Sequence, residues 1–169
     1  MAKVTVKDVH GVASEVEAEL LQFKNSIYGI AVRRGANGVA ETLIIPQFDG
    51  YDWPGGTIDK GEEHLDALVR EYKEESGLEA TATPGGLISI HTSLFKSPTK
   101  GHLQSLLIFY FVDVVGGEIS QDGFTEYEKK YSGLAKWMPI SELRKMRHAC
   151  GIDIAGGLLD AAESKASGL

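Results

Sequence analysis

The sequence has little of several features that mark particular classes of protein. It holds one cysteine, Cys150, in 169 residues, so no disulfide forms within the chain, and such usage is typical of a reducing compartment. It has no apolar run of about 18 residues, which a membrane-spanning helix requires. The first residues also lack the apolar core of a signal peptide. We therefore expect a cytoplasmic protein with no membrane partner.

Basic residues are also scarce relative to acidic ones. The chain has 17 Lys and Arg against 24 Asp and Glu, a net charge of −7. Because sequence-independent binding of nucleic acid needs a basic face, we expect no nucleic-acid partner. An acidic protein that binds a phosphate compound needs divalent cations to bridge the two, and a cluster of carboxylates is present to hold them.

The length predicts one domain, residues 1–169. Hydrophobic patterns and glycine-rich breaks predict strands at residues 26–33, 41–47, 86–95, 104–115 and 135–138. They predict helices from residue 62 or 63 to 76, at 141–147 with Ser141 as N-cap, and at 152–164. Glycine pairs such as Gly156 and Gly157 read as turns. Because strands and helices do not alternate regularly, we expect an α+β or layered α/β/α domain with a mixed sheet.

The first of these helices contains the candidate metal-binding residues. Its apolar stripe has residues at i, i+3, i+4 and i+7: Leu65, Leu68, Val69 and Tyr72. On a neighbouring face lie Glu71, Glu74 and Glu75. These carboxylates repel one another and lie near the helix C-terminus, where the macrodipole disfavours anions. Mg²⁺ or Mn²⁺ would offset the repulsion because hard cations take oxygen ligands; the alternative is an acidic face in solvent.

The spacing around this helix resembles a known motif. Gly56, five residues, Glu62, seven residues and then Arg70-Glu71-Tyr72-Lys73-Glu74-Glu75-Ser76-Gly77-Leu78 match the Nudix box, G-x5-E-x7-R-E-U-x-E-E-x-G-U, where U is bulky and apolar. Tyr72 stands where an aliphatic residue is usual. Trp53-Pro54-Gly55-Gly56 before the box and residues 135–143 after it also resemble the family, so the resemblance covers about residues 22–147.

The resemblance implies a Nudix-type α/β/α sandwich, with a mixed β-sheet between helices. It implies a Mg²⁺-dependent hydrolase, with Mn²⁺ as the substitute, that cleaves a phosphoanhydride in a nucleoside diphosphate derivative such as ADP-ribose, a nucleotide sugar or a dinucleotide polyphosphate. Alternatives are a nucleoside triphosphate substrate or a non-catalytic nucleotide-binding or regulatory domain. A Nudix-fold prenyl diphosphate isomerase needs a different box and a catalytic cysteine, and Cys150 lies far past the box. Many relatives form homodimers.

The resemblance also implies roles for individual residues. The metal ligands are Glu71, Glu74, Glu75 and the carbonyl oxygen of Gly56, while Glu62 and Arg70 orient the carboxylates. The catalytic set is Glu62, Arg70, Glu74, Glu75 and Glu128. The general base varies within the family between a box glutamate and a later loop glutamate, for which Glu128 and Glu126 are the candidates here; each is otherwise a solvated charge.

The substrate side is less strongly patterned. Tyr28, Phe48 and Tyr51 are candidates for stacking on a base, and Trp53 is expected in the core. Four basic residues are candidates for contacting phosphate: Arg33, Arg34, Lys96 and Lys100, of which the last two lie in the loop at residues 96–102. This loop follows a predicted strand, so we expect it to set specificity. Solvated basic side chains and core aromatic rings are the alternatives.

Overall fold

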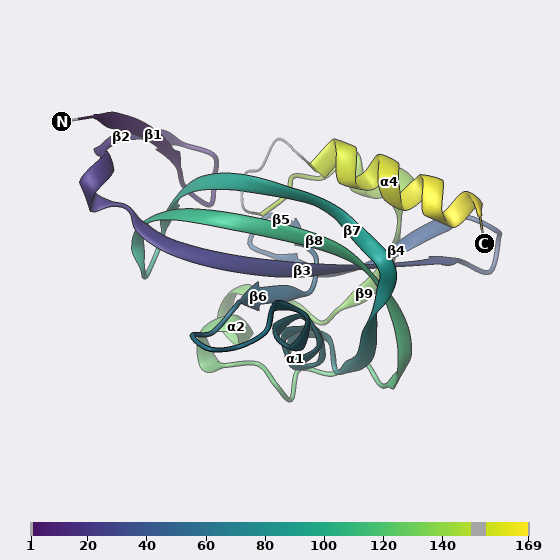
Figure 1. The fold of residues 1–169 in the computed structure, drawn as a ribbon. Helices are drawn as coiled ribbons and strands as arrows, with labels where there is room; N and C mark the ends of the chain where they lie inside the picture. Colours follow the sequence, from purple (N-terminus) through teal and green to yellow (C-terminus); the bar gives the residue numbers. More distant parts are fainter. Residues whose placement is uncertain (1, 150–154, 169) are drawn as a thin grey trace.

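A curled mixed sheet with helices on both faces forms the structure, a computed structural model that describes residues 2–149 and 155–168 (Figure 1). Cys150 and the start of the helix predicted at 152–164 lie outside these residues. The strand order is β2-β1-β7-β8-β3-β4-β5, while β6 pairs with β3 and β9 pairs with β4. The helices α1 and α2 lie on one face and α4 on the other (Figure 1). The predicted layered fold with a mixed sheet is confirmed.

The strands are β1 (Lys3–Lys7), β2 (Ala13–Glu17), β3 (Gln22–Arg34), β4 (Ala40–Gln47), β5 (Gly50–Asp52), β6 (Gly55–Thr57), β7 (Leu78–Ser97), β8 (Gly101–Gly117) and β9 (Lys136–Pro139). The helices are α1 (His64–Ser76), α2 (Glu126–Tyr131), α3 (Ile140–Leu143) and α4 (Ala155–Ser167), with a 3₁₀ turn at Ala18–Leu20. Among the described residues, none of these helices combines the length and apolarity needed to cross a bilayer.

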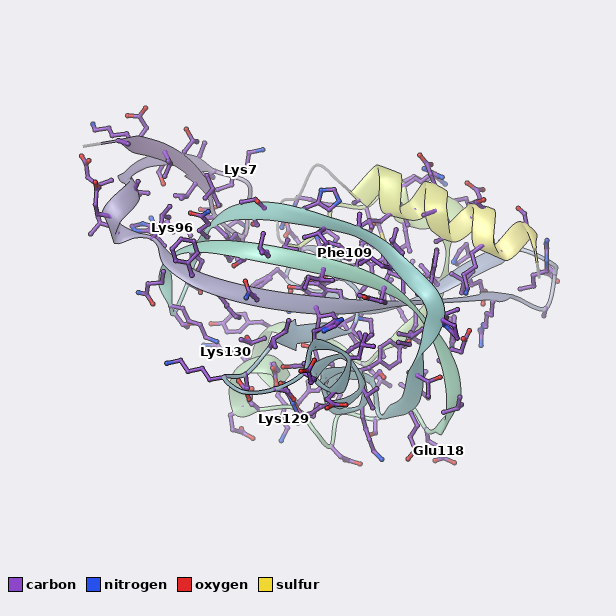
Figure 2. The ribbon with its side chains drawn as sticks, viewed as in Figure 1. Lys7, Lys96, Phe109, Glu118, Lys129 and Lys130 are labelled. Atoms are coloured by element: carbon purple, nitrogen blue, oxygen red, sulfur yellow. The ribbon has the colours of Figure 1, made fainter. Side chains whose placement is uncertain are left out.

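Alternation along the strands creates two cores, one on each face of the sheet. On β3, Ile27 and Ala31 pack with α1, whereas Ile30 packs with α4. Because side chains on a strand point to opposite faces in turn, one apolar strand serves both layers. Phe109 of β8 is fully buried in the second core, while Lys129 and Lys130 extend outward from α2 (Figure 2).

The helix α1 ends as predicted, but only half of its predicted apolar stripe, Leu68 and Tyr72, is buried. Gly77 has φ 77° and donates its N–H to the Lys73 carbonyl oxygen, the left-handed stop that glycine adopts without strain. Of the predicted apolar stripe, Leu65 is 37% exposed and Val69 is 41% exposed. The buried residues are Ala67, Leu68, Tyr72 and Ser76. The buried face of α1 is thus rotated from the predicted stripe toward the side that carries the glutamates. The spacing of the apolar residues alone does not predict this rotation.

Several predictions near the C-terminus were wrong. The helix α3 starts at Ile140 with Pro139 at the N-cap position, so Ser141 lies inside the helix. Gly156 and Gly157 lie within α4 rather than in a turn. The segment around Glu128, which was assigned to a loop, forms α2.

Candidate active site

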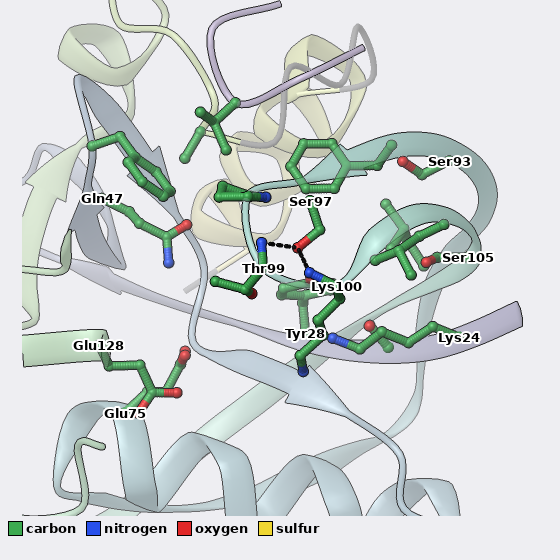
Figure 3. A pocket seen from close by; sticks show the side chains of 18 of the residues that line it. Lys24, Tyr28, Gln47, Glu75, Ser93, Ser97, Thr99, Lys100, Ser105 and Glu128 are labelled. Atoms are coloured by element: carbon green, nitrogen blue, oxygen red, sulfur yellow. Dashed lines mark hydrogen bonds between the residues drawn. The ribbon is translucent and has the colours of Figure 1, made fainter. Parts of the chain in front are cut away.

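A cleft opens where β3 and β4 separate. These strands pair only between Val32–Arg34 and residues 40–42, and farther along β3 its partner is β6, with Tyr28 opposite Gly55. Two adjoining pockets of about 580 and 400 Å³ occupy this opening. Figure 3 shows the larger one, between Gln47 on one side and Lys24 and Tyr28 on the other. They share seven lining residues: Lys24, Tyr28, Gln47, Glu75, Lys100, Thr125 and Glu128.

The smaller pocket, called here the carboxylate pocket, gathers the acidic residues of the box. Glu71, Glu74 and Glu75 of α1 line it together with Gly55 and Gly56 of β6. Further acidic residues from other segments line it as well: Asp52, Asp59 and Glu128. The three glutamates of the helix therefore line one pocket, together with acidic residues from outside the helix.

Arg70 ties this cluster together. Its Nε and Nη2 atoms donate to the two carboxylate oxygens of Glu62, each at 2.8 Å. Its Nη1 donates to Glu71 at 2.9 Å and to Glu74 at 3.3 Å. The paired hydrogen bonds from Arg70 lower the pKa of Glu62 to about 2. Glu62 thus stays ionised and holds the guanidinium group of Arg70 in place.

Glu75 and Glu71 are the two carboxylates of the pocket whose pKa values are raised by burial. Burial raises the pKa of Glu75 well above its usual value, and the negative charges of Asp52, Glu71 and Glu128 raise it further. Its carboxylate accepts one hydrogen bond from the Gly55 N–H, at 2.9 Å, which lowers the pKa in part. Burial also raises the pKa of Glu71. Carboxylates in such surroundings favour a proton or a metal cation.

The residues present fit a hard divalent cation. The donors in the carboxylate pocket are oxygen atoms, as Mg²⁺ and Mn²⁺ require. A Cβ atom placed on Gly56 would lie 2.5 Å from the Cδ of Glu71, so only glycine lets this carboxylate approach β6. Within the described residues, no three acidic, histidine or cysteine side chains already converge as a metal cluster. Arg70 instead holds the carboxylates of Glu71 and Glu74 through hydrogen bonds from its Nη1.

Glu128 reaches the cleft from α2, whereas Glu126 does not. Thr125 and Glu128 form a capping box, in which the Thr125 N–H donates to Glu128 Oε2 at 2.7 Å and the Glu128 N–H donates to Thr125 Oγ1 at 3.3 Å. Glu128 lines both pockets, close to Glu75 (Figure 3). Glu126 is 92% exposed and pairs with Lys129. The Thr-x-x-Glu pattern is a helix-start signal that could have predicted α2.

The four candidate substrate contacts separate into two groups. Tyr28 lines both pockets, stacked on Phe109 at 5.2 Å between ring centroids, and Phe48 lines the larger one. Tyr51 is fully buried against Trp53 and lies outside both pockets. Arg33 also lies outside them, because it pairs with Glu41 at 2.8 Å and stacks over Trp137. The structure thus does not bring Tyr51 or Arg33 to the cleft.

Sequence reasoning missed much of the larger pocket. Its floor includes Lys24 of β3, Ser105 of β8 and Ser93 of β7, which are direct neighbours across the sheet. Asp52, which lines the carboxylate pocket, pairs with buried His148, with 3.0 Å between Oδ1 and Nε2. Only strand register reveals the first group, because its members lie far apart in the sequence.

A family model and a curated protein both match this chain. The model of the NUDIX domain family matches residues 29–164. An ADP-ribose pyrophosphatase of Methanocaldococcus jannaschii is 38% identical over 66 residues, which are 39% of this chain and 36% of that protein. The chain thus spans about a third of the length of this curated relative.

Solved structures agree in fold. The Escherichia coli ORF135 protein has a TM-score of 0.59 at 19% identity, over 86% of this chain and 94% of that one. The NUDIX domain of Shewanella oneidensis NrtR, complexed with ADP ribose, has a TM-score of 0.58 at 11% identity, over 89% and 93%. At such identities these structures support the fold alone. The family match covers most of the chain and includes the box that builds the carboxylate pocket, and the chain therefore belongs to the NUDIX domain family.

Proposed function

We propose that this protein is a Mg²⁺-dependent hydrolase that cleaves a phosphoanhydride bond in a nucleoside diphosphate derivative. The observation that carries the proposal is one cleft that joins a carboxylate pocket to a pocket lined by aromatic and hydroxyl side chains. A nucleoside diphosphate derivative has the same two parts. ADP-ribose is the first substrate to test, because the curated relative is named an ADP-ribose pyrophosphatase and the NrtR domain was solved with ADP ribose.

In the proposed hydrolysis, different residues hold the cation, position the carboxylates and accept the proton. Glu71, Glu74, Glu75 and the Gly56 carbonyl oxygen would hold the cation, which supplies positive charge that polarises phosphoryl oxygens and lowers the pKa of water. Arg70 and Glu62 keep the carboxylates in position through their paired hydrogen bonds. A carboxylate facing the cleft accepts the proton of the attacking water, and the bridging oxygen leaves with the other phosphate.

We assign the general base to Glu128. It lines both pockets and its orientation is fixed by the capping box with Thr125. We expect Glu128→Gln to lower kcat by about 10²–10⁴-fold, because glutamine cannot accept the proton, while it can still cap the helix. The matched control is Glu126→Gln on the same helix, which should leave kcat unchanged because Glu126 is exposed beside Lys129. Steady-state kinetics of both variants check this, and full activity of Glu128→Gln would move the role to a box glutamate.

A substrate panel tests the proposed function. It contains ADP-ribose, nucleotide sugars, diadenosine polyphosphates and nucleoside triphosphates, assayed with and without millimolar Mg²⁺, and phosphatase is added to reveal monoester products. Metal-dependent release with one substrate class, absent from Glu75→Gln, is the expected result. Turnover only of nucleoside triphosphates would favour a triphosphate pyrophosphohydrolase. Binding without turnover across the panel would favour a regulatory domain. The homodimer, the cytoplasmic location and the single domain stay predictions.

A further inference from the structure

The two pockets have different linings, and they meet at a boundary formed by the residues that line both of them. The carboxylate pocket holds the box glutamates and backbone of β6. Beyond the boundary, the larger pocket is lined by the rings of Phe48 and Phe95 and by the hydroxyl groups of Ser93 and Ser105. The second lining suits a base and a sugar, because rings stack and hydroxyl groups both donate and accept hydrogen bonds. Its volume of about 580 Å³ falls within the range of small-molecule sites.

Two lysines stand at the boundary. Among the described residues that line either pocket, Lys24 and Lys100 are the only lysines or arginines, and each lines both pockets. Figure 3 shows their side chains converging beside Tyr28. The other charged residues that line the cleft are all acidic, so the two ammonium groups mark the place where an anionic part of a ligand is stabilised.

Each lysine is positioned by a different element. Lys24 lies on β3 directly beside Ser105 of β8, which lies beside Ser93 of β7, so all three side chains share one face of the sheet. Lys100 comes from the turn between β7 and β8. The Ser97 hydroxyl group accepts hydrogen bonds from the backbone N–H groups of Thr99, at 3.3 Å, and Lys100, at 3.1 Å (Figure 3). The turn thus has a defined shape that brings Lys100 to the ring and hydroxyl side of the cleft.

From this arrangement, and resting on the proposed function, we infer that Lys24 and Lys100 bind the phosphate nearest the nucleoside. The nucleoside then lies in the larger pocket, and the remaining phosphate reaches the carboxylate pocket with its cation. Both lysines are positioning residues, because they hold the substrate in register with Glu75 and Glu128 and take no part in proton transfer. The cleft accordingly recognises a nucleoside diphosphate in two ways. The two lysines at the pocket boundary bind its phosphate, and the aromatic rings of the larger pocket stack on its base.

Binding of non-hydrolysable ligands tests this inference without catalysis. The probes are the α,β-methylene analogues of ADP, GDP and UDP, with the corresponding nucleosides, titrated by calorimetry with Mg²⁺ present. Lys24→Met and Lys100→Met keep most of the stem and remove the charge. We expect each to weaken binding of the best diphosphate analogue by about tenfold or more, since a charge-assisted hydrogen bond is lost. The affinity for its nucleoside should remain that of the wild type.

Lys96→Met is the matched control. Lys96 lies on the same hairpin, but it alternates with the pocket residues Phe95 and Ser97 and so points to the other face of β7. Its replacement should leave both affinities unchanged. In steady-state assays, Lys24→Met and Lys100→Met should raise KM by a similar factor with little change in kcat, as expected for uniform binding.

The outcomes separate this inference from the proposed function. Wild-type affinity of both lysine variants for the diphosphate analogue overturns the inference, as does equal weakening of the nucleoside. Failure of the wild-type protein to bind any of the analogues also overturns it. Lysine-dependent binding of an analogue combined with silence across the substrate panel supports the inference and contradicts the hydrolase.

Discussion

Glu75→Gln is expected to lower turnover by about 10²-fold or more, because the variant loses one charged oxygen atom among the proposed ligands of the cation. The change is nearly isosteric, and glutamine can still accept the hydrogen bond from the Gly55 N–H. Turnover of ADP-ribose or of the best panel substrate, measured over a range of Mg²⁺ concentrations, gives the result.

Stability should move in the opposite direction. Without metal, the buried carboxylate of Glu75 faces the charges of Asp52, Glu71 and Glu128, all of which raise its pKa. Removing its charge relieves that repulsion, so the metal-free variant should melt at or above the wild-type temperature, the trade-off common at active sites. The rise in melting temperature that Mg²⁺ gives the wild type by binding the native state should shrink in the variant.

Glu79→Gln is the matched control. Glu79 follows α1 directly, but its carboxylate pairs with Lys73 and lies outside both pockets. Its loss should leave turnover and the metal response unchanged. If Glu75→Gln kept wild-type turnover, the assignment of Glu75 as a metal ligand would be refuted.

The carboxylate half of the cleft could be predicted because its residues lie close together in the sequence. One helix carries Glu71, Glu74 and Glu75, and its periodicity places them on one patch. Arg70 and Glu62 belong to the same motif, and the family resemblance implied the orienting roles to which their hydrogen bonds correspond. Local rules also predicted Gly77 as the end of the helix, because a left-handed residue there is a property of the backbone alone.

The other half could not be predicted, because strand pairing creates it. Lys24 and Ser93 lie far apart in the sequence and are brought together only through Ser105 of the strand between them. Arg33 was expected to contact phosphate, yet pairing of β3 with β4 places Glu41 beside it. Tyr51 was expected to stack on a base, but its backbone pairs with Arg147 and Ala149, and its ring is buried. Register decides each of these positions, and a single sequence does not specify it.

Gly56→Ala is expected to abolish most activity with little change in stability. The new Cβ would lie 2.5 Å from the Cδ of Glu71, whose carboxylate must then move away from β6. That carboxylate ends a flexible side chain, so moving it disturbs the fold little while displacing a proposed metal ligand. We expect turnover to fall by about 10²-fold, with a melting temperature close to that of the wild type.

Gly29→Ala is the opposite case, because the obstacle is rigid. Its Cβ would lie 2.7 Å from Cδ2 of Tyr72, a ring that is fully buried under the sheet. Overpacking of this kind destabilises by about 1–3 kcal/mol, which for a domain of this size lowers the melting temperature by roughly 2–12 °C. Turnover of the folded protein should stay near that of the wild type. Thermal melts and steady-state kinetics of both variants check the pair. Full activity of Gly56→Ala would contradict the contact between Gly56 and Glu71. A melting temperature that falls in Gly56→Ala but not in Gly29→Ala would contradict it as well.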